Sequence, residues 1–209
     1  MALEDALAPA RQPPPGPVTY EEFLEWADED TWAEWVDGHV IPLPLPIHEA
    51  HARITTFLIM LFRLAARGDS LGRVLGEPYQ VRLPRWMRRG RSPDVIFVAR
   101  SHLDRLRAHY LDGPADIIVE VVSPESIRRD RIEKRAEYEQ AGVPEYWLVD
   151  HENETAEVLR LGPDARYRVA FSGATGSYQS QVLPTLRLKV EWLWHEPPLE
   201  DVLRELGIR

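Results

Sequence analysis

Cysteine is absent from this 209-residue chain. Its absence excludes a disulfide framework, a thiol nucleophile and any thiolate-bound zinc or iron–sulfur centre. Lysine is scarce, because only Lys134 and Lys189 of the 25 basic residues are lysine. No apolar run approaches the roughly 18 residues that a membrane-spanning helix needs, and residues 1–17 lack the basic and then apolar segments of a signal peptide. We therefore expect a soluble, cytoplasmic protein without a membrane partner.

The overall composition is that of a globular protein, with 44% hydrophobic and 28% charged residues. The net charge of −9 argues against a histone-like protein that binds nucleic acid through its total charge, but it allows a local contact with DNA. Five prolines make residues 1–18 a flexible leader. We expect one domain over residues 19–195 and a short amphipathic helix over 196–209.

Local patterns predict a single α/β domain with a mixed sheet flanked by helices. Thr19 and Glu22 form a capping box at a helix start, and Asp37-Gly38 between two β-prone runs indicates a hairpin. Gly142 is expected to end a helix. Further helices are predicted over 48–67, 101–111 and 127–141, and strands over 34–36, 39–41, 74–83, 94–98, 115–122, 145–150, 155–161 and 166–172, with a basic loop between 83 and 94.

Glu120 is the most unusual residue, because it interrupts an otherwise apolar run that is typical of a strand buried on both faces. A buried carboxylate without a partner costs several kcal/mol, so Glu120 needs a metal, an arginine or a proton. One interpretation is a functional site. The other is a structural salt bridge with an arginine.

Asp94 directly follows Pro93 at the start of another predicted strand. Pro-Asp is also common at strand starts without any function. If the strands of Asp94 and Glu120 are neighbours, the two carboxylates meet at one point. Oxygen ligands of this kind suit a hard divalent cation such as Mg²⁺.

Asp130, Lys134 and Tyr138 recur at intervals of four residues and so share one face of the predicted helix. The spacing is compatible with a solvated face that carries an Asp–Lys pair. It is equally compatible with a face that turns towards Glu120 and brings the Lys134 ammonium close to it.

These residues together resemble a known family. Pro93-Asp94, Glu120-Val121-Val122-Ser123-Pro124, the Asp130/Lys134/Tyr138 set and the segment from Gly142 to Asp150 are similar to the Uma-two family of restriction endonuclease-like proteins. That family belongs to the PD-(D/E)XK nuclease superfamily. Glu34-Trp35-Val36-Asp37-Gly38 and His48 also match, and the resemblance spans about residues 19–195.

The resemblance implies a restriction-endonuclease-like fold built on a four-stranded mixed sheet. It also implies a Mg²⁺ or Mn²⁺ ion held by Asp94, Glu120 and the backbone carbonyl of Val121. This sequence departs from the Glu-x-Lys pattern, because Val122 occupies the lysine position. In the Uma-two pattern a lysine of the next helix substitutes, which corresponds to Lys134, and Glu34 would be an accessory acid.

The predicted function is therefore metal-dependent hydrolysis of phosphodiester bonds, with DNA as the expected substrate. The metal would polarise a phosphodiester oxygen and acidify a water, and Lys134 would orient that water or stabilise the added negative charge. Arginines and Trp86 are candidate contacts to nucleic acid, against the alternative of a solvated basic loop. The candidate arginines are Arg85, Arg88, Arg89, Arg91 and Arg128.

Two alternatives belong to other functional classes. The valine at position 122 and the net acidity favour a catalytically silent nuclease-fold module that binds nucleic acid or protein. A tryptophan-rich C-terminal segment instead favours a scaffold that forms a homodimer. His48 and His51 lack the spacing of a His-Glu-x-x-His zinc motif and are interpreted as core or capping histidines.

Overall fold

The structure is a computed structural model that describes residues 12–28, 31–43 and 48–208. Residues 1–11 of the expected leader lie outside the described residues. Residues 12–18 have no regular secondary structure, but they are tied to the domain by hydrogen bonds. The indole of Trp26 donates to the carbonyl of Gln12, and the indole of Trp35 donates to the carbonyl of Val18.

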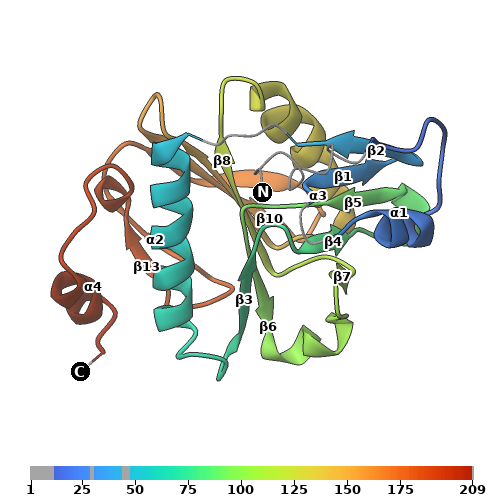
Figure 1. Ribbon diagram of the computed structural model, residues 1–209. Coiled ribbons are helices and arrows are strands. Elements are labelled where there is room, and N and C mark those ends of the chain that lie inside the picture. The colour runs from blue at the N-terminus through green and yellow to red at the C-terminus, as the bar shows by residue number, and fades with distance from the viewer. Residues whose placement is uncertain (1–11, 29–30, 44–47, 209) are drawn as a thin grey trace, which may run out of the picture.

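A six-stranded mixed sheet forms the centre of the fold. Its strand order is β11-β10-β9-β8-β6-β3; the β8–β9 pair is parallel and the other pairs are antiparallel. Helix α2 (Glu49–Ala65) lies along one face of this sheet, and α3 (Arg135–Ala141) lies near the end of β8 (Figure 1). The strands are β3 (Gly72–Gly76), β6 (Val95–Ala99), β8 (Ile117–Val122), β9 (Glu145–Asp150), β10 (Thr155–Leu161) and β11 (Tyr167–Gly173).

A second sheet of five strands extends to the right in Figure 1 and carries helix α1 (Tyr20–Trp26). The resemblance implied a single sheet of four strands, so the described sheets of six and five strands are larger than that expectation. The strands, in the order β2-β1-β5-β4-β7, are β2 (His39–Pro42), β1 (Ala33–Val36), β5 (Arg89–Arg91), β4 (Gln80–Arg82) and β7 (Tyr110–Asp112).

Most of the locally encoded elements are confirmed. Thr19 and Glu22 form the capping box of α1, with both reciprocal hydrogen bonds present. Asp37 and Gly38 have positive φ angles of 51° and 91°, as the tight turn between β1 and β2 requires. Gly142 ends α3 in the left-handed conformation with φ 84°.

Four expectations need correction. The predicted strand over 74–83 is two strands, β3 and β4, in different sheets, with Pro78 between them; proline has no N–H for a continuous ladder. The predicted helix over 101–111 is a short 3₁₀ helix, η3 (Arg100–Arg105), followed by β7. The expected basic loop contains the 3₁₀ turn η2 (Arg85–Met87) and β5. The predicted helix over 127–141 begins as a π-helical stretch, η4 (Arg129–Lys134), and continues as α3.

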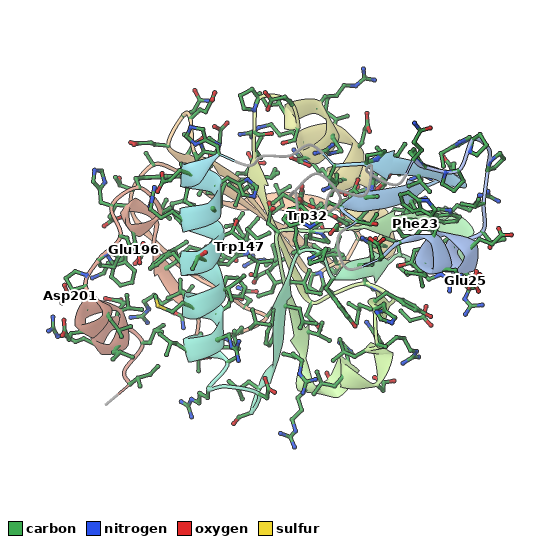
Figure 2. All side chains as sticks on the ribbon, in the orientation of Figure 1. Phe23, Glu25, Trp32, Trp147, Glu196 and Asp201 are labelled. Atoms are coloured by element: carbon green, nitrogen blue, oxygen red, sulfur yellow. The ribbon has the colours of Figure 1, made fainter. Side chains whose placement is uncertain are left out.

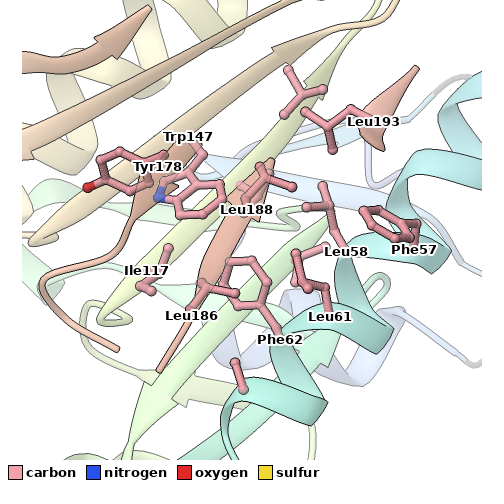
Figure 3. Packing of buried hydrophobic residues seen from close by; sticks show 14 of the residues in the cluster. Phe57, Leu58, Leu61, Phe62, Ile117, Trp147, Tyr178, Leu186, Leu188 and Leu193 are labelled. Atoms are coloured by element: carbon pink, nitrogen blue, oxygen red, sulfur yellow. The ribbon is translucent and has the colours of Figure 1, made fainter. Parts of the chain in front are cut away.

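The main core lies between α2 and the six-stranded sheet. Phe57, Leu58, Leu61 and Phe62 of α2 pack towards Trp147 of β9 (Figure 3). Leu186, Leu188 and Leu193 of the C-terminal region close this cluster.

The region after β11 covers the outer side of α2. It contains β12 (Ser177–Gln179), β13 (Arg187–Lys189), the 3₁₀ helix η5 (Val190–Leu193) and α4 (Leu199–Glu205). Figure 2 shows α4 at the left edge of the molecule, with Asp201 on it. Val202 of α4 is fully buried in the main core, and α4 lies within the 196–209 range predicted for a short amphipathic helix. Among the described helices, none combines the length and the apolar character that crossing a bilayer requires.

Candidate metal and phosphodiester site

The β6–β8 register brings the two predicted acids to one edge of the sheet. Val95 pairs with Val119 in an antiparallel ladder, so the next position sets Asp94 opposite Glu120. Beyond that point β8 remains paired with β9 as far as Val122. Strand β6 therefore separates from β8 at Asp94 and Glu120, and a cavity of about 530 Å³ opens there. Asp94, Glu120, Val121 and Lys134 all line it.

Glu120 points towards α3 because alternate residues of a strand face the same side of a sheet. Its neighbours on that face, Ile118 and Val122, are in the same core cluster as Tyr138 of α3. One carboxylate oxygen of Glu120 accepts hydrogen bonds from the Lys134 ammonium and from the Tyr138 hydroxyl, both at 2.9 Å. Lys134 and Tyr138 therefore lie on one helix face, as their spacing predicted, and this face is turned towards Glu120. The cation that pairs with Glu120 is a lysine and not an arginine.

Lys134 is the positive centre of a buried group of acids. Its Nζ lies 2.9 Å from Glu120, 3.1 Å from Glu34 and 3.5 Å from Asp130. Burial by itself would lower the pKa of Lys134, but the three carboxylates outweigh burial and raise that pKa. Lys134 therefore remains an ammonium at physiological pH.

Glu34 on β1 is fully buried and connects the site to the second sheet. Besides Lys134, it accepts hydrogen bonds from Arg91 at 2.7 Å and from the backbone N–H of Ser92 at 3.3 Å. Burial alone would raise the pKa of Glu34, but the charges of Lys134 and Arg91 outweigh it and hold the pKa at about 2. Glu34 is therefore a permanent anion that fixes the position of Lys134.

Asp94 bridges the end of β8 and the start of α2. One of its carboxylate oxygens accepts from the backbone N–H of Val121, and the other lies 2.9 Å from Nε2 of His51. The N–H and C=O of one strand residue point to the same side of the strand. The carbonyl of Val121 is thus directed towards the side of β8 on which Asp94 lies.

Several carboxyl groups lie close together at this cavity, and their mutual repulsion favours binding of a hard cation. Burial and then the charge of Asp94 raise the pKa of Glu77, a further residue of the cavity wall, to about 8. Burial, together with the nearby Asp130, Asp94 and Glu34, raises the pKa of Glu120 well above its ordinary value despite Lys134. A divalent cation would relieve this repulsion, and oxygen atoms are the ligands it prefers.

The donor set is two carboxylates and one carbonyl. Within the described ranges, no group of three or more His, Asp or Glu side chains is arranged as a complete metal site. Asp94, Glu120 and the carbonyl of Val121 fit a divalent ion by their chemistry, and solvent would complete its coordination.

Four buried polar atoms of cavity-lining residues have no hydrogen-bond partner in the described part of the chain. They are Oγ of Ser92, Nε of Arg129, Oδ1 of Asp130 and Nε2 of His151. Unsatisfied buried groups are uncommon and costly in a folded protein. Two of these atoms, Nε of Arg129 and Oδ1 of Asp130, lie 3.7 Å apart as an ion pair, and all four belong to residues of one cavity wall.

The predicted arginines separate into two groups. Arg91 is buried and pairs with Glu34 and Glu137, and Arg89 pairs with Asp37 and Glu137. Their guanidinium groups are engaged in ion pairs within the protein. The other three predicted arginines, Arg85, Arg88 and Arg128, are exposed.

Several residues of the cavity wall were not among the predicted site residues, and among them are the polar residues Glu77, His51, Ser92 and Arg129. His51 was interpreted as a core or capping histidine, but it contacts Asp94; His48 does cap α2, through a bond from the N–H of Ala50. The helical spacing of His48 and His51 at the start of α2 was the available signal for His51. Glu77 and Ser92 had no local signal, because only the fold brings them to the cavity.

Comparison with known proteins agrees with this geometry. No curated protein matches the chain. A crystal structure described as that of "a putative nuclease belonging to DUF820" from Anabaena variabilis superposes with a TM-score of 0.71 at 20% identity, covering 86% of this chain and 98% of the other. At that identity the match shows a common fold. The model of the Uma2 family, described as "Putative restriction endonuclease", matches residues 20–191. The resemblance noted in the sequence is therefore confirmed, and the chain belongs to the Uma2 family of restriction endonuclease-like proteins.

Proposed function

We propose that this protein is a metal-dependent endonuclease that hydrolyses phosphodiester bonds in DNA. The observation that carries the proposal is the contact of Lys134 Nζ with Glu120 at 2.9 Å, in a cavity that Asp94 also lines. Lysine is missing from its usual place two residues after the glutamate, where this chain has Val122. An ammonium from η4 beside Glu120 removes the main sequence argument for a catalytically silent module.

Asp94, Glu120 and the carbonyl of Val121 would hold Mg²⁺ or Mn²⁺. When bound, such an ion supplies Lewis-acid polarisation and lowers the pKa of a coordinated water. The chain's own residues do the remaining work. Lys134, fixed by Glu34, offers an N–H donor to the nucleophilic water or to the negative charge that develops on the phosphate.

Donors in the cavity wall support binding of a phosphate. Oγ of Ser92 and Nε of Arg129 make no hydrogen bond in the described structure, although Nε of Arg129 lies 3.7 Å from Asp130, and a phosphodiester oxygen accepts hydrogen bonds from both kinds of group. Arg129 also brings positive charge close to the acids, since its charge helps to lower the pKa of Glu34. Outside the cavity, Arg85, Arg88, Arg128 and the 65% exposed Trp86 are proposed to contact the DNA strand.

The test is cleavage of supercoiled plasmid and of single-stranded circular DNA by the purified protein with Mg²⁺, Mn²⁺ or EDTA. We expect metal-dependent cleavage that Asp94→Asn, Glu120→Gln and Lys134→Met each reduce. For Lys134→Met the reduction should be at least about 100-fold, the loss typical of removing one donor to the transition state. Glu196→Gln, an exposed carboxylate away from the cavity, is the matched control. Unfolding curves confirm that each variant is folded.

Calorimetric titration with Mn²⁺ separates the proposal from the silent module. An endonuclease of this design binds the ion, and Asp94→Asn weakens that binding. Undiminished cleavage by the purified Asp94 and Glu120 variants would reject the assigned residues. Absence of both cleavage and metal binding in the wild-type protein would favour a silent binding module. Light scattering of the same samples tests the predicted homodimer.

A further inference from the structure

The cavity beside the candidate site is larger than a phosphate group and a metal ion require. Its volume of about 530 Å³ lies within the range of roughly 300–1,000 Å³ that is usual for sites that bind organic ligands. The acids and Lys134 account for one part of the wall. Another part is aromatic or apolar and includes Trp32, His48, Pro124 and His151.

The aromatic part of the wall has a flat, ordered surface. The imidazole rings of His48 and His151 are stacked, with centroids 5.3 Å apart and planes only 11° from parallel. Figure 2 shows Trp32 between α2 and the β1–β2 hairpin. An arrangement of flat rings favours a planar ligand, because stacking buries apolar area on both partners.

Polar atoms at the edges of the two histidine rings add hydrogen-bonding capacity. Nδ1 of His48 accepts a hydrogen bond from the N–H of Ala50 at 3.2 Å, so the neutral ring carries its proton on Nε2 as a donor. Nε2 of His151 is buried and has no partner among the described residues. A ligand that is planar and carries donors and acceptors on its edge, as a nucleobase does, matches both features.

The aromatic wall lies next to the acids. His48, the N-cap of α2, precedes His51, the partner of Asp94, by three residues, which is just under one helical turn, or roughly 4.5 Å along the axis. His151 follows Asp150, whose register partner on β8 is Val122, two residues after Glu120. The aromatic wall and the acids therefore line the same cavity at neighbouring positions.

We propose that Trp32, His48 and His151 bind an unpaired nucleobase beside the cleaved phosphate. In a paired duplex the bases are stacked inside the helix, and a base enters a concave pocket only by leaving the stack. The substrate is therefore single-stranded DNA, or a duplex that carries an extrahelical nucleotide. Stacking selects for unpaired bases with little sequence preference. This inference rests on the proposed endonuclease function.

The test measures binding, so that it does not depend on cleavage. Fluorescence anisotropy with Ca²⁺ compares three labelled DNAs of one sequence: a single strand, a fully paired duplex and a duplex with one unpaired nucleotide. A gel confirms that each probe stays intact. Trp32→Ala and His151→Ala are compared with His109→Ala, an exposed histidine that does not line the cavity.

We expect the single strand to bind at least about tenfold more tightly than the paired duplex, with the duplex that has an unpaired nucleotide in between. Loss of one stacking partner weakens single-strand binding about 5-fold to 150-fold, and His109→Ala leaves it unchanged. Since Trp32→Ala could also disturb folding, His151→Ala serves as the second variant, and thermal unfolding is recorded for both.

Two results would overturn the inference, and they differ in what they say about the proposed function. Equal affinity for single strand and paired duplex, with the duplex cleaved, rejects the nucleobase wall and leaves the endonuclease proposal intact. Absence of binding to all three DNAs, together with absence of cleavage, rejects both proposals.

Discussion

Replacing Lys134 by methionine tests the central ion-pair group by its effect on stability. Methionine keeps most of the apolar stem of lysine and removes the ammonium that lies within 3.5 Å of Glu120, Glu34 and Asp130. Removing one partner of a buried ion pair leaves an uncompensated charge and typically costs about 3–5 kcal/mol. For a chain of this length each kcal/mol lowers Tm by about 2–4 °C, so we expect Tm to fall by roughly 6–20 °C.

The structure also predicts which second substitution restores stability. Without Lys134, Glu34 still accepts from Arg91 and from the N–H of Ser92. Glu120 keeps the Tyr138 hydroxyl as its hydrogen-bond donor among the described side chains. Adding Glu120→Gln to Lys134→Met should therefore recover at least about 1.5 kcal/mol, the lower value for a hydrogen bond to a charged group. Adding Glu34→Gln should recover less.

Urea unfolding of the wild type, the three single variants and the two double variants gives these free energies, provided that the m-values agree. Lys134→Met within about 1 kcal/mol of the wild type would contradict the buried ion-pair group. Equal recovery by both double variants would contradict the assignment of Glu120 as the acid that depends most on Lys134.

Three other predictions address the surroundings of the site. Glu77 has a pKa raised to about 8 from its usual 4.5. The contribution of Glu77 to the free energy of unfolding is thus fully present below pH 4.5 and declines as pH rises towards 8. Glu77→Gln should remove that decline in thermal unfolding, as should saturating Mg²⁺ in the wild type. Arg91→Met should cost at least about 1.5 kcal/mol, the lower value for a hydrogen bond to a charged group, because Glu34 and Glu137 lose their shared guanidinium but keep Lys134 and Arg89; urea unfolding no different from the wild type would contradict the structural role of Arg91. The double substitution Arg85→Ala/Arg88→Ala should reduce the salt dependence of single-strand binding by about 1.4 in slope, at roughly 0.7 per phosphate contact, and an unchanged slope would place the DNA elsewhere.

The sequence by itself determined the elements whose signals lie within a few residues. The capping box of Thr19 and Glu22, the Asp37-Gly38 turn and the end of α3 at Gly142 all depend on local backbone chemistry, and each is present. A carboxylate in an apolar strand identified Glu120 as unusual, and the spacing of Lys134 and Tyr138 gave them a common face. Whether that face met Glu120 or solvent was open in the sequence.

Only the tertiary structure decided which residues form ion pairs and which residues line the cavity. Arg91 follows Arg88 and Arg89 in one basic segment, yet it is buried against Glu34 and Glu137, which lie 57 and 46 positions away in the chain. His51 and Glu77 reach the cavity because α2 and the end of β3 pack beside β6. Spacing along one element is fixed by its own geometry, whereas ion pairs and cavity walls depend on which elements pack together and in which register.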